Sequence, residues 1–305
     1  MNDQEKIHII LNPKAANGKP LRILPLLTDA LNQRKIRYDL FISERPRHAT
    51  EYILSLDGEA RTLIAVGGDG TVNEVVNGIQ HSSTRFSVIP AGTGDDFARL
   101  LGISSIDHCL HALENNSTRT FDMGRIDFEE ATGEKKTHAF INTMGIGFDA
   151  AVAHRVVQSK TGKGILPYLI AVFQTLRSYE ATPVTIRFLQ EEKKEKLFLA
   201  SIGNGTTSGG GFILSPRAKP NDGLLDLCLV RDIKTLRVLR VLPKTFKGKH
   251  LSESEVFYQQ APAFDVALTD PRVIHADGEI ISTQAVHVSV SLQGSKLQVL
   301  SSNLE

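Results

Sequence analysis

The sequence has little cysteine and no excess of charge of either sign. Its 305 residues include two cysteines, Cys109 and Cys228, and 35 Lys and Arg against 34 Asp and Glu. Two distant cysteines without ligand spacing argue against a disulfide framework, so we expect small buried residues in a reducing compartment. The balanced charge argues against a nucleic-acid-binding protein, because such proteins usually carry a strong basic excess.

A long hydrophobic run is also missing. The first residues, MNDQEKIHIILNP, are acidic where a signal peptide needs positive charge, and their apolar run is short. The longest apolar stretch elsewhere, GILPYLIAVFQTL from Gly164, falls well below the roughly 20 residues that a membrane-spanning helix needs. We therefore expect a cytoplasmic protein without a transmembrane segment, with a peripheral position at a membrane surface as the alternative.

Strand and helix patterns alternate in the first part of the chain. The expected strands span residues 6–12, 38–43, 62–66 and 86–90, and the expected helices 20–34, 48–56, 72–79 and 106–113. Within the third helix, Val72, Val75, Val76 and Ile79 fall on one helical face. This order predicts an α/β domain over residues 1–128, with a doubly wound parallel sheet covered by helices on both faces.

Extended patterns dominate the second part, with helices expected only near 164–178 and 234–242. The expected strands are 138–144, 183–189, 196–204, 224–231, 256–260, 264–268, 273–275 and 286–292. They predict a second, mainly antiparallel β-sandwich domain over residues 129–289, and a tail of about 290–305 that returns to the first domain. The cleft between the domains is the expected ligand site.

Glycine turns follow three of the expected strands. They read NPKAANGK at 12–19, VGGDGT at 66–71 and AGTG at 91–94. A strand, a glycine turn and a helix present backbone N–H groups to an anion, and open α/β sheets bind ligands at this carboxyl edge. One such loop alone is equally well explained as a tight turn with a capping aspartate. Three of them favour a cradle for a polyphosphate, although neither a P-loop nor a dinucleotide fingerprint is present.

An acid lies inside the central turn, where a phosphate loop usually carries a lysine. Asp69 would repel a bare nucleotide. Phosphoryl transfer requires Mg²⁺ to neutralise the phosphates, and carboxylates hold that ion or its waters. The acid therefore predicts a divalent cation at this site.

Five motifs resemble the diacylglycerol kinase catalytic domain, in particular that of the soluble bacterial lipid kinases. They are GGDGTVNEVVNGI at 67–79, IPAGTGDDFAR at 89–99, FDMG at 121–124, KPNDGLLDL at 219–227 and DGE at 277–279. GGDG alone is weak, since it also occurs in NAD kinases and phosphofructokinases, but the set appears in the family's order over nearly the whole chain. The resemblance implies an NAD kinase/diacylglycerol kinase-like fold, ATP as phosphate donor, Mg²⁺, and a lipid alcohol such as diacylglycerol at a membrane surface.

The resemblance also implies site residues. The nucleotide-binding positions are Asn12, Pro13, Lys14, Ala15, Ala16, Ser43, Gly67, Gly68, Asp69, Gly70, Thr71, Val72, Asn73, Glu74, Gly92 and Thr93. A structural Mg²⁺ would be bound by the side chain of Asp222 and the carbonyls of Lys219 and Leu224. Asp69 and Asp122 match acids that reach this ion and the phosphates through water.

Asp277 and Glu279 match the acidic pair that the family uses to accept the proton of the lipid hydroxyl. A carboxylate can take that proton as the bond to the γ-phosphorus forms. We favour Asp277 as the base, with Glu279 second. The alternative for HADGE at 275–279 is an exposed hairpin turn, since Asp-Gly is common there.

Two loops depart from the family pattern. The family has Ser-Gly after Asn-Pro where this chain has KAANG, and asparagine where it has Asp95. We expect the phosphate contacts to be displaced or weakened, and nucleotide affinity to be lower. No proposed metal ligand or base is lost.

Several alternatives stay open at this stage. Residues 234–250, KTLRVLRVLPKTFKGKH, either lie on anionic lipid or form an ordinary surface helix with its apolar side in the core. The rival functions are NAD kinase-like phosphorylation of a soluble acceptor, and a nucleotide-binding regulatory protein that has lost turnover. The sequence identifies neither the lipid nor the oligomeric state.

Overall fold

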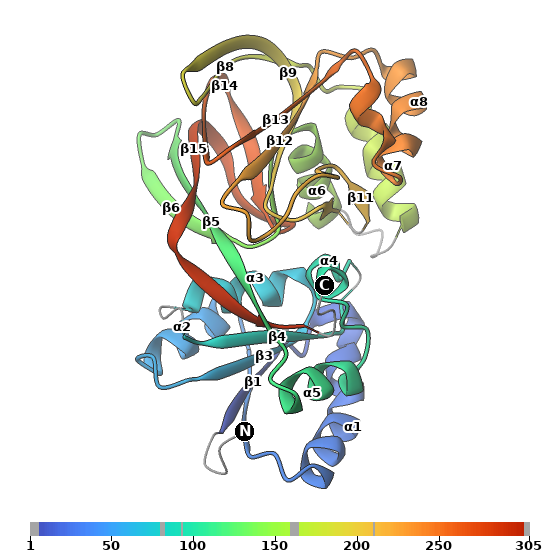
Figure 1. Cartoon of the computed structure of the whole chain (residues 1–305). Helices are drawn as coiled ribbons and strands as arrows, with labels where there is room; N and C mark the ends of the chain where they lie inside the picture. Colours follow the sequence, from blue (N-terminus) through green and yellow to red (C-terminus); the bar gives the residue numbers. More distant parts are fainter. Residues whose placement is uncertain (1–5, 80–82, 93, 159–164, 210, 302–305) are drawn as a thin grey trace. The chain divides into compact units, whose positions relative to one another are not determined.

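The computed structural model describes residues 6–79, 83–92, 94–158, 165–209 and 211–301 (Figure 1). The chain divides into two compact units. The N-terminal unit comprises Met1–Asp122 and Gly294–Glu305, and the C-terminal unit comprises Met123–Gln293. The chain passes from one unit to the other within two long strands, β5 (Thr118–Glu130) and β15 (Glu279–Leu300).

A parallel sheet forms the centre of the N-terminal unit, in the strand order β2-β1-β3-β4. Its strands are β1 (Ile7–Leu11), β2 (Tyr38–Ile42), β3 (Thr62–Gly67) and β4 (Arg85–Pro90). The end of β15 pairs with β4 in parallel, and Gln298 lies opposite Arg85. Every residue of β3 is buried, as expected for a strand that is covered on both faces.

Helices cover both faces of this sheet (Figure 1). They are α1 (Lys19–Gln33), α2 (His48–Ser55), α3 (Asp69–Gly78), α4 (Asp96–Leu100) and α5 (Ile106–Glu114), with a 3-10 turn, η1 (Ala15–Gly18), before α1. α2 packs against α3, and α1 packs against α5. Ser105 caps α5, because its hydroxyl accepts a hydrogen bond from the His108 N–H. The predicted doubly wound α/β fold is confirmed.

The C-terminal unit is an antiparallel β structure in the order β13-β12-β9-β7-β14-β15. Its strands, besides β5 and β15, are β6 (Lys135–Phe140), β7 (Thr143–Gly147), β8 (Thr182–Phe188), β9 (Glu191–Gly203), β10 (Thr207–Ser208), β11 (Phe212–Ile213), β12 (Leu225–Arg231), β13 (Val256–Ala261) and β14 (Ala263–Ala276). β9 and β14 each pair with β8 at one end and β7 at the other. Their buried side chains form one apolar core, which includes Phe140, Ile202 and Phe264.

Three helices and a second apolar cluster lie beside these strands. The helices are α6 (Phe148–Gln158), α7 (Ile165–Leu176) and α8 (Thr235–Thr245), and a 3-10 turn, η2 (Lys249–Ser252), follows α8. The sequence did not predict α6. Its buried residues, Phe148, Ala150 and Val152, alternate along the chain, and a period of two does not indicate a helix.

One predicted strand, 138–144, is in fact divided into β6 and β7. The break falls at Ile141 and Asn142, whose N–H groups donate to the side chain of Asp277 instead of a neighbouring strand. Conversely, the predicted strands 264–268 and 273–275 form the single strand β14.

Both cysteines are buried free thiols, as predicted, and burial raises the pKa of each to about 12. The helices in the described part of the chain include none that is long and apolar enough to cross a bilayer.

Candidate active site

The strand ends of the N-terminal unit lie side by side at the carboxyl edge of the sheet. The Asn12 N–H donates to the Val66 carbonyl at 3.1 Å, and the Ala91 N–H donates to the Gly67 carbonyl at 2.9 Å. These bonds join the ends of β1, β3 and β4. The three loops proposed for phosphate binding therefore start from one edge.

Gly68 and Gly92 bring two of these loops into backbone contact. A Cβ on Gly92 would lie 2.4 Å from the Cα of Gly68, and one on Gly68 would lie 2.9 Å from the Cα of Gly92. A Cβ on Gly67 would lie 2.2 Å from the hydroxyl oxygen of Thr71. Close approach, and not an unusual φ, explains why glycine occupies these three positions.

The start of α3 offers groups that suit a phosphate. The hydroxyl of Thr71 is buried and has no hydrogen-bond partner among the described residues. The N–H groups of Thr71 and Val72 donate to the Gly68 carbonyl, and the helix dipole favours an anion at this end of α3. A phosphate at this position would satisfy a polar atom that the fold leaves unpaired, so the loop fits the group that it was predicted to bind.

Aspartates fix the geometry of the same loops. Asp69 Oδ1 accepts a hydrogen bond from the Asp96 N–H at 2.9 Å, and Asp95 Oδ1 accepts one from the Gly92 N–H at 2.9 Å. Burial raises the pKa of Asp95, and the hydrogen bond from Gly92 opposes this shift. Asp95 has a left-handed φ of 51°, which Asp and Asn tolerate better than most residues. An asparagine would supply the same acceptor oxygen, so this departure from the family preserves the turn.

Other predicted nucleotide residues hold the loops in place. The Lys14 ammonium donates to the Glu44 carbonyl at 3.0 Å, next to the buried Ser43 at the end of β2. The Glu74 carboxylate accepts a hydrogen bond from the Ala49 N–H at 3.2 Å and so connects α3 to α2. The side chains of Val72 and Asn73 are buried. Thr93 lies outside the described residues.

The first loop contains consecutive residues with left-handed backbone conformations. Ala16, Asn17 and Gly18 have φ angles of 40°, 56° and 82°. This is a backbone conformation that glycine favours, and Ala16 adopts it at a cost of about 1–2 kcal/mol.

An Ala16→Gly variant should therefore be more stable than the wild type by about 0.5–1 kcal/mol. The substitution removes the strain of an alanine in a left-handed conformation, and this gain exceeds the free-energy cost of the backbone entropy that glycine loses on folding. Urea unfolding measures this difference. Ala15→Gly is the matched control, because Ala15 is not among the residues with positive φ, and it should lose stability. Equal effects at both positions would contradict the assignment.

Asp122 has a cationic partner that the sequence did not suggest. It is buried on β5, and its Oδ1 lies 2.9 Å from the ammonium of Lys296 on β15. Both residues belong to the N-terminal unit. Lys296 reaches Asp122 because the end of the chain returns to this sheet. The sequence analysis expected a tail that returns, but no motif marks Lys296 as the partner of Asp122.

The predicted metal segment forms an exposed turn in the C-terminal unit. Asp222 Oδ1 accepts a hydrogen bond from the Leu224 N–H at 3.0 Å, and the Asp222 N–H donates to the Lys219 carbonyl at 3.4 Å. No three His, Cys, Asp or Glu side chains cluster as metal ligands in the ranges that the structure covers. Carboxylate and carbonyl oxygens suit Mg²⁺, which keeps several of its waters, so the turn fits a hydrated ion.

A second acid, Asp226, lies close to this turn and was not singled out from the sequence. It is fully buried on β12, and its Oδ1 accepts hydrogen bonds from the hydroxyl of Tyr258 at 2.5 Å and the side-chain amide of Gln260 at 3.1 Å. Burial is the main cause that raises its pKa, and the charge of Asp222 adds to the shift. Its Oδ2 is buried and has no partner among the described residues.

The two acids of the DGE motif have different environments. The Asp277 carboxylate is buried, and it accepts hydrogen bonds from the N–H groups of Ile141, Asn142 and Thr143 at 3.0, 2.9 and 3.0 Å. Glu279, the first residue of β15, is exposed. Asp277 therefore joins the β14–β15 turn to the segment between β6 and β7, whereas the carboxylate of Glu279 is reached by solvent.

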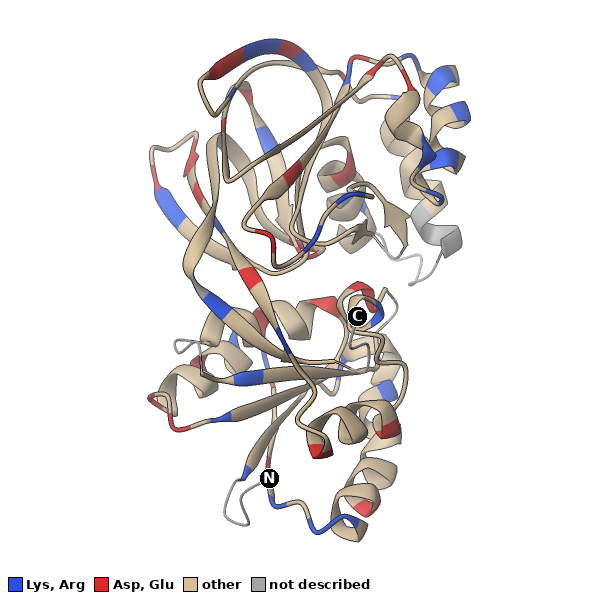
Figure 2. Cartoon of the chain, viewed as in Figure 1, with Lys and Arg blue, Asp and Glu red and all other residues tan. Residues whose placement is uncertain are grey.

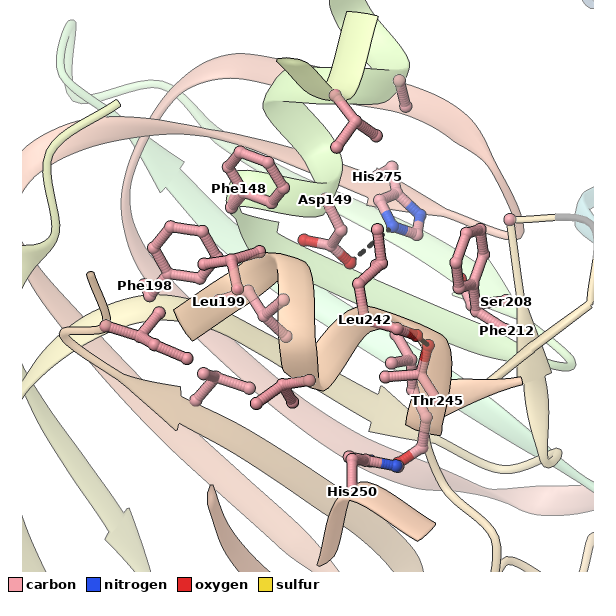
Figure 3. A pocket seen from close by; sticks show the side chains of 18 of the residues that line it. Phe148, Asp149, Phe198, Leu199, Ser208, Phe212, Leu242, Thr245, His250 and His275 are labelled. Carbon is pink, nitrogen blue, oxygen red and sulfur yellow. Dashed lines mark hydrogen bonds and ion pairs between the residues drawn. The ribbon is translucent and has the colours of Figure 1, made fainter. Parts of the chain in front are cut away.

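An apolar cavity of about 110 Å³ lies in the C-terminal unit, between helices and strands (Figure 3). Its walls come from α6, α7, α8, β9, β12 and the DGE turn. The lining includes Phe148, Asp149, Val172, Phe198, Leu199, Ser208, Phe212, Leu214, Val238, Val241, Leu242, Thr245, His250, His275 and Gly278. The sequence did not predict this cavity, because its lining residues are spread over 130 positions (148 to 278).

A histidine and an aspartate are paired in the cavity wall. Nε2 of His275 is 3.1 Å from Oδ2 of Asp149, and the two side chains point toward one another in Figure 3. A carboxylate only accepts, so the shared proton is on Nε2. The other ring nitrogen is buried and unpartnered within the described ranges. A Cβ on Gly145 would lie 2.2 Å from both paired atoms, so glycine leaves the space that they occupy.

Comparison with known proteins agrees with the fold. Family models for the diacylglycerol kinase catalytic domain and for the YegS C-terminal NAD kinase beta sandwich-like domain match residues 6–126 and 142–301. The chain is 32% identical over 225 residues to a diacylglycerol kinase of Bacillus subtilis (strain 168). The matched region covers 71% of this chain and 70% of that protein. The chain belongs to the diacylglycerol kinase catalytic-domain family. This membership confirms the resemblance and places the chain among kinases.

Another relative and two solved structures extend the match over nearly the whole chain. A diacylglycerol kinase of Mycobacterium tuberculosis (strain CDC 1551 / Oshkosh) is 27% identical over 290 residues, or 93% of this chain and 92% of that one. The crystal structure of a diacylglycerol kinase from Bacillus anthracis str. Sterne has a TM-score of 0.69 at 21% identity and covers 97% of both chains. An NAD kinase from Archaeoglobus fulgidus in complex with ATP has a TM-score of 0.56 at 10% identity, over 98% of this chain and 94% of that one. These two structures show the shared fold alone.

Proposed function

We propose that the protein transfers the γ-phosphate of ATP to the hydroxyl of a lipid alcohol, such as diacylglycerol, with Mg²⁺. The observation that carries this proposal is the apolar cavity, whose wall includes His275 and Gly278 beside the acids of the DGE motif. An acceptor with an apolar chain would fill the cavity and bring its polar end to this turn. A dinucleotide acceptor such as NAD has no apolar chain to place there.

The N-terminal unit is assigned to ATP. The edge loops pack against each other at Gly68 and Gly92, and the unpaired hydroxyl of Thr71 in the first of them can donate to a phosphate oxygen. An NAD kinase that shares this fold was solved in complex with ATP, so the fold is able to bind that nucleotide. Mg²⁺, when bound, would neutralise phosphate charge, and Asp69 and Asp122 of this unit would be linked to it through water. In the C-terminal unit, Asp222 is the proposed side-chain ligand of Mg²⁺.

We assign the base to Glu279 and a positioning role to Asp277, which reverses the order expected from the sequence. Three backbone N–H groups donate to Asp277, and protonation of its carboxylate would weaken those bonds. Glu279 is exposed and follows directly after the turn that Asp277 holds. It can therefore take up a proton from a lipid hydroxyl without breaking the fold.

The Asp149–His275 pair is assigned to the polar end of the lipid. Both side chains line the cavity, and Nδ1 of His275 is buried without a partner among the described residues. A hydroxyl near the reacting carbon of the lipid could pair with this nitrogen. Because the donor is ATP and the acceptor is a lipid, we further propose a cytoplasmic protein that acts peripherally at a membrane.

An acceptor comparison tests the proposal. Purified protein, ATP and Mg²⁺ should release ADP when diacylglycerol in mixed micelles is added, and should show no added release with NAD. EDTA should abolish the reaction, because without Mg²⁺ the negative charge of the phosphates is not neutralised and the nearby carboxylates repel it. Formation of NADP at a rate that matches or exceeds lipid phosphorylation would reject the lipid assignment.

A further inference from the structure

Helix α8 has two apolar faces, and only one of them is covered. Val238 and Val241 are buried, line the cavity and pack in the cluster shared with α6 and α7. On the other side Leu236 is 76% exposed and Leu239 is 37% exposed. The sequence analysis left two alternatives for this segment, a surface helix with its apolar side in the core and a segment that lies on lipid. Helix α8 has features of both, because one side packs in the core and the other carries exposed apolar side chains.

The exposed apolar side chains continue beyond α8. Phe246, directly after the helix, is 42% exposed, and Ile170 and Phe173 on α7 are 40% and 53% exposed. Phe246 also packs against Phe212 with ring centroids 4.4 Å apart, and Phe212 lines the cavity. The exposed apolar surface therefore reaches the rim of the cavity.

Cations surround these side chains. Residues 234–250 contain six Lys and Arg and no acid, and Figure 2 shows Lys and Arg but no Asp or Glu along α8. Arg237 and Lys244 form ion pairs with Glu253. Arg240 and Lys247 form no ion pair within the ranges that the structure describes, so their charge is available to a partner.

We propose that Leu236, Leu239 and Phe246, together with Arg240 and Lys247, form a docking surface for an anionic phospholipid bilayer. The inference rests on the proposed function, because it specifies how that lipid reaches the cavity. Apolar side chains would enter the headgroup boundary while the cations meet anionic headgroups. The bilayer fits this surface better than a second copy of the chain, since a twofold contact would bring two basic faces together.

Vesicle sedimentation tests the surface. Wild type should sediment with vesicles of phosphatidylcholine and phosphatidylglycerol, bind phosphatidylcholine alone only weakly, and dissociate in high salt. Arg240→Gln/Lys247→Gln should weaken binding by about 25-fold, at about fivefold for each cation. Leu236→Ser/Leu239→Ser should weaken it at least about tenfold through lost apolar insertion. Lys135→Gln/Lys194→Gln, on exposed hairpins of the same unit, is the charge-matched control and should bind like wild type.

A second assay separates this inference from the kinase assignment. All of these variants should phosphorylate a short-chain diacylglycerol dispersed in detergent at the wild-type rate, because none of the substituted residues belongs to the proposed catalytic or nucleotide site. Failure of every variant to change vesicle binding would overturn the surface, and so would equal binding to neutral vesicles. A dimer in solution that Leu236→Ser/Leu239→Ser dissolves would identify a contact between copies instead. Vesicle binding without any lipid phosphorylation would reject the kinase assignment and leave the docking surface intact.

Discussion

A Glu279→Gln variant is expected to phosphorylate lipid roughly two to four orders of magnitude more slowly than the wild type, the usual effect of removing a general base. Glutamine keeps the size and polarity of the side chain but does not accept a proton at neutral pH. Since Glu279 is exposed, the substitution should lower the unfolding midpoint far less than a substitution of the buried Asp277. Steady-state measurements should show the loss in kcat, with KM for ATP close to that of the wild type.

Glu191→Gln is the matched control for this effect. Glu191 is also an exposed glutamate at the first position of a strand, β9, but lies far along the chain from the DGE motif. Its substitution should leave turnover intact. Full activity of Glu279→Gln, with loss of activity in a stably folded Asp277 variant, would return the role of base to Asp277.

The second large effect is expected in stability. An Asp277→Asn variant should lose about 2–4 kcal/mol, because the amide keeps one acceptor oxygen and turns an NH₂ group toward backbone N–H donors that are buried. Asp277 has a left-handed φ of 48°, which asparagine tolerates, so the substitution changes the hydrogen bonds and not the turn. Thermal unfolding should show a midpoint lowered by about 5–15 °C for a unit of this size.

The outcome for Asp277→Asn distinguishes a positioning residue from a base. If the carboxylate mainly holds the turn, activity should recover in part at low temperature, where the variant is folded. A variant with wild-type stability and no activity at any temperature would contradict the positioning role and point to direct proton transfer.

Local patterns were sufficient to predict the N-terminal unit. The run at β3 is apolar throughout because both faces of the strand are buried, and Gly68 and Gly92 mark a backbone contact that no other residue permits. Such features leave a signal in the sequence itself. The Lys296 partner of Asp122 leaves none, because it depends on the return of β15 to the sheet.

The C-terminal unit was predicted less well, for physical reasons. Helix α6 buries alternate residues at its start and so resembles a strand. The DGE motif suggested that Asp277 is a catalytic acid. Its structural role is visible only in the hydrogen bonds that its carboxylate accepts from three backbone N–H groups. The pairing of Asp149 with His275 spans 126 positions, and a glycine at position 145 makes room for it. Contacts of this kind are set by tertiary packing.

The lipid kinase activity is tested most directly by following the transfer of labelled phosphate from ATP to lipid. The protein should be incubated with radiolabelled ATP, Mg²⁺ and lipids extracted from bacterial membranes, beside Glu279→Gln. We expect label in the organic phase, in a lipid phosphomonoester that the variant does not form. Label that stays in the aqueous phase with every lipid, or equal lipid labelling by the variant, would contradict it.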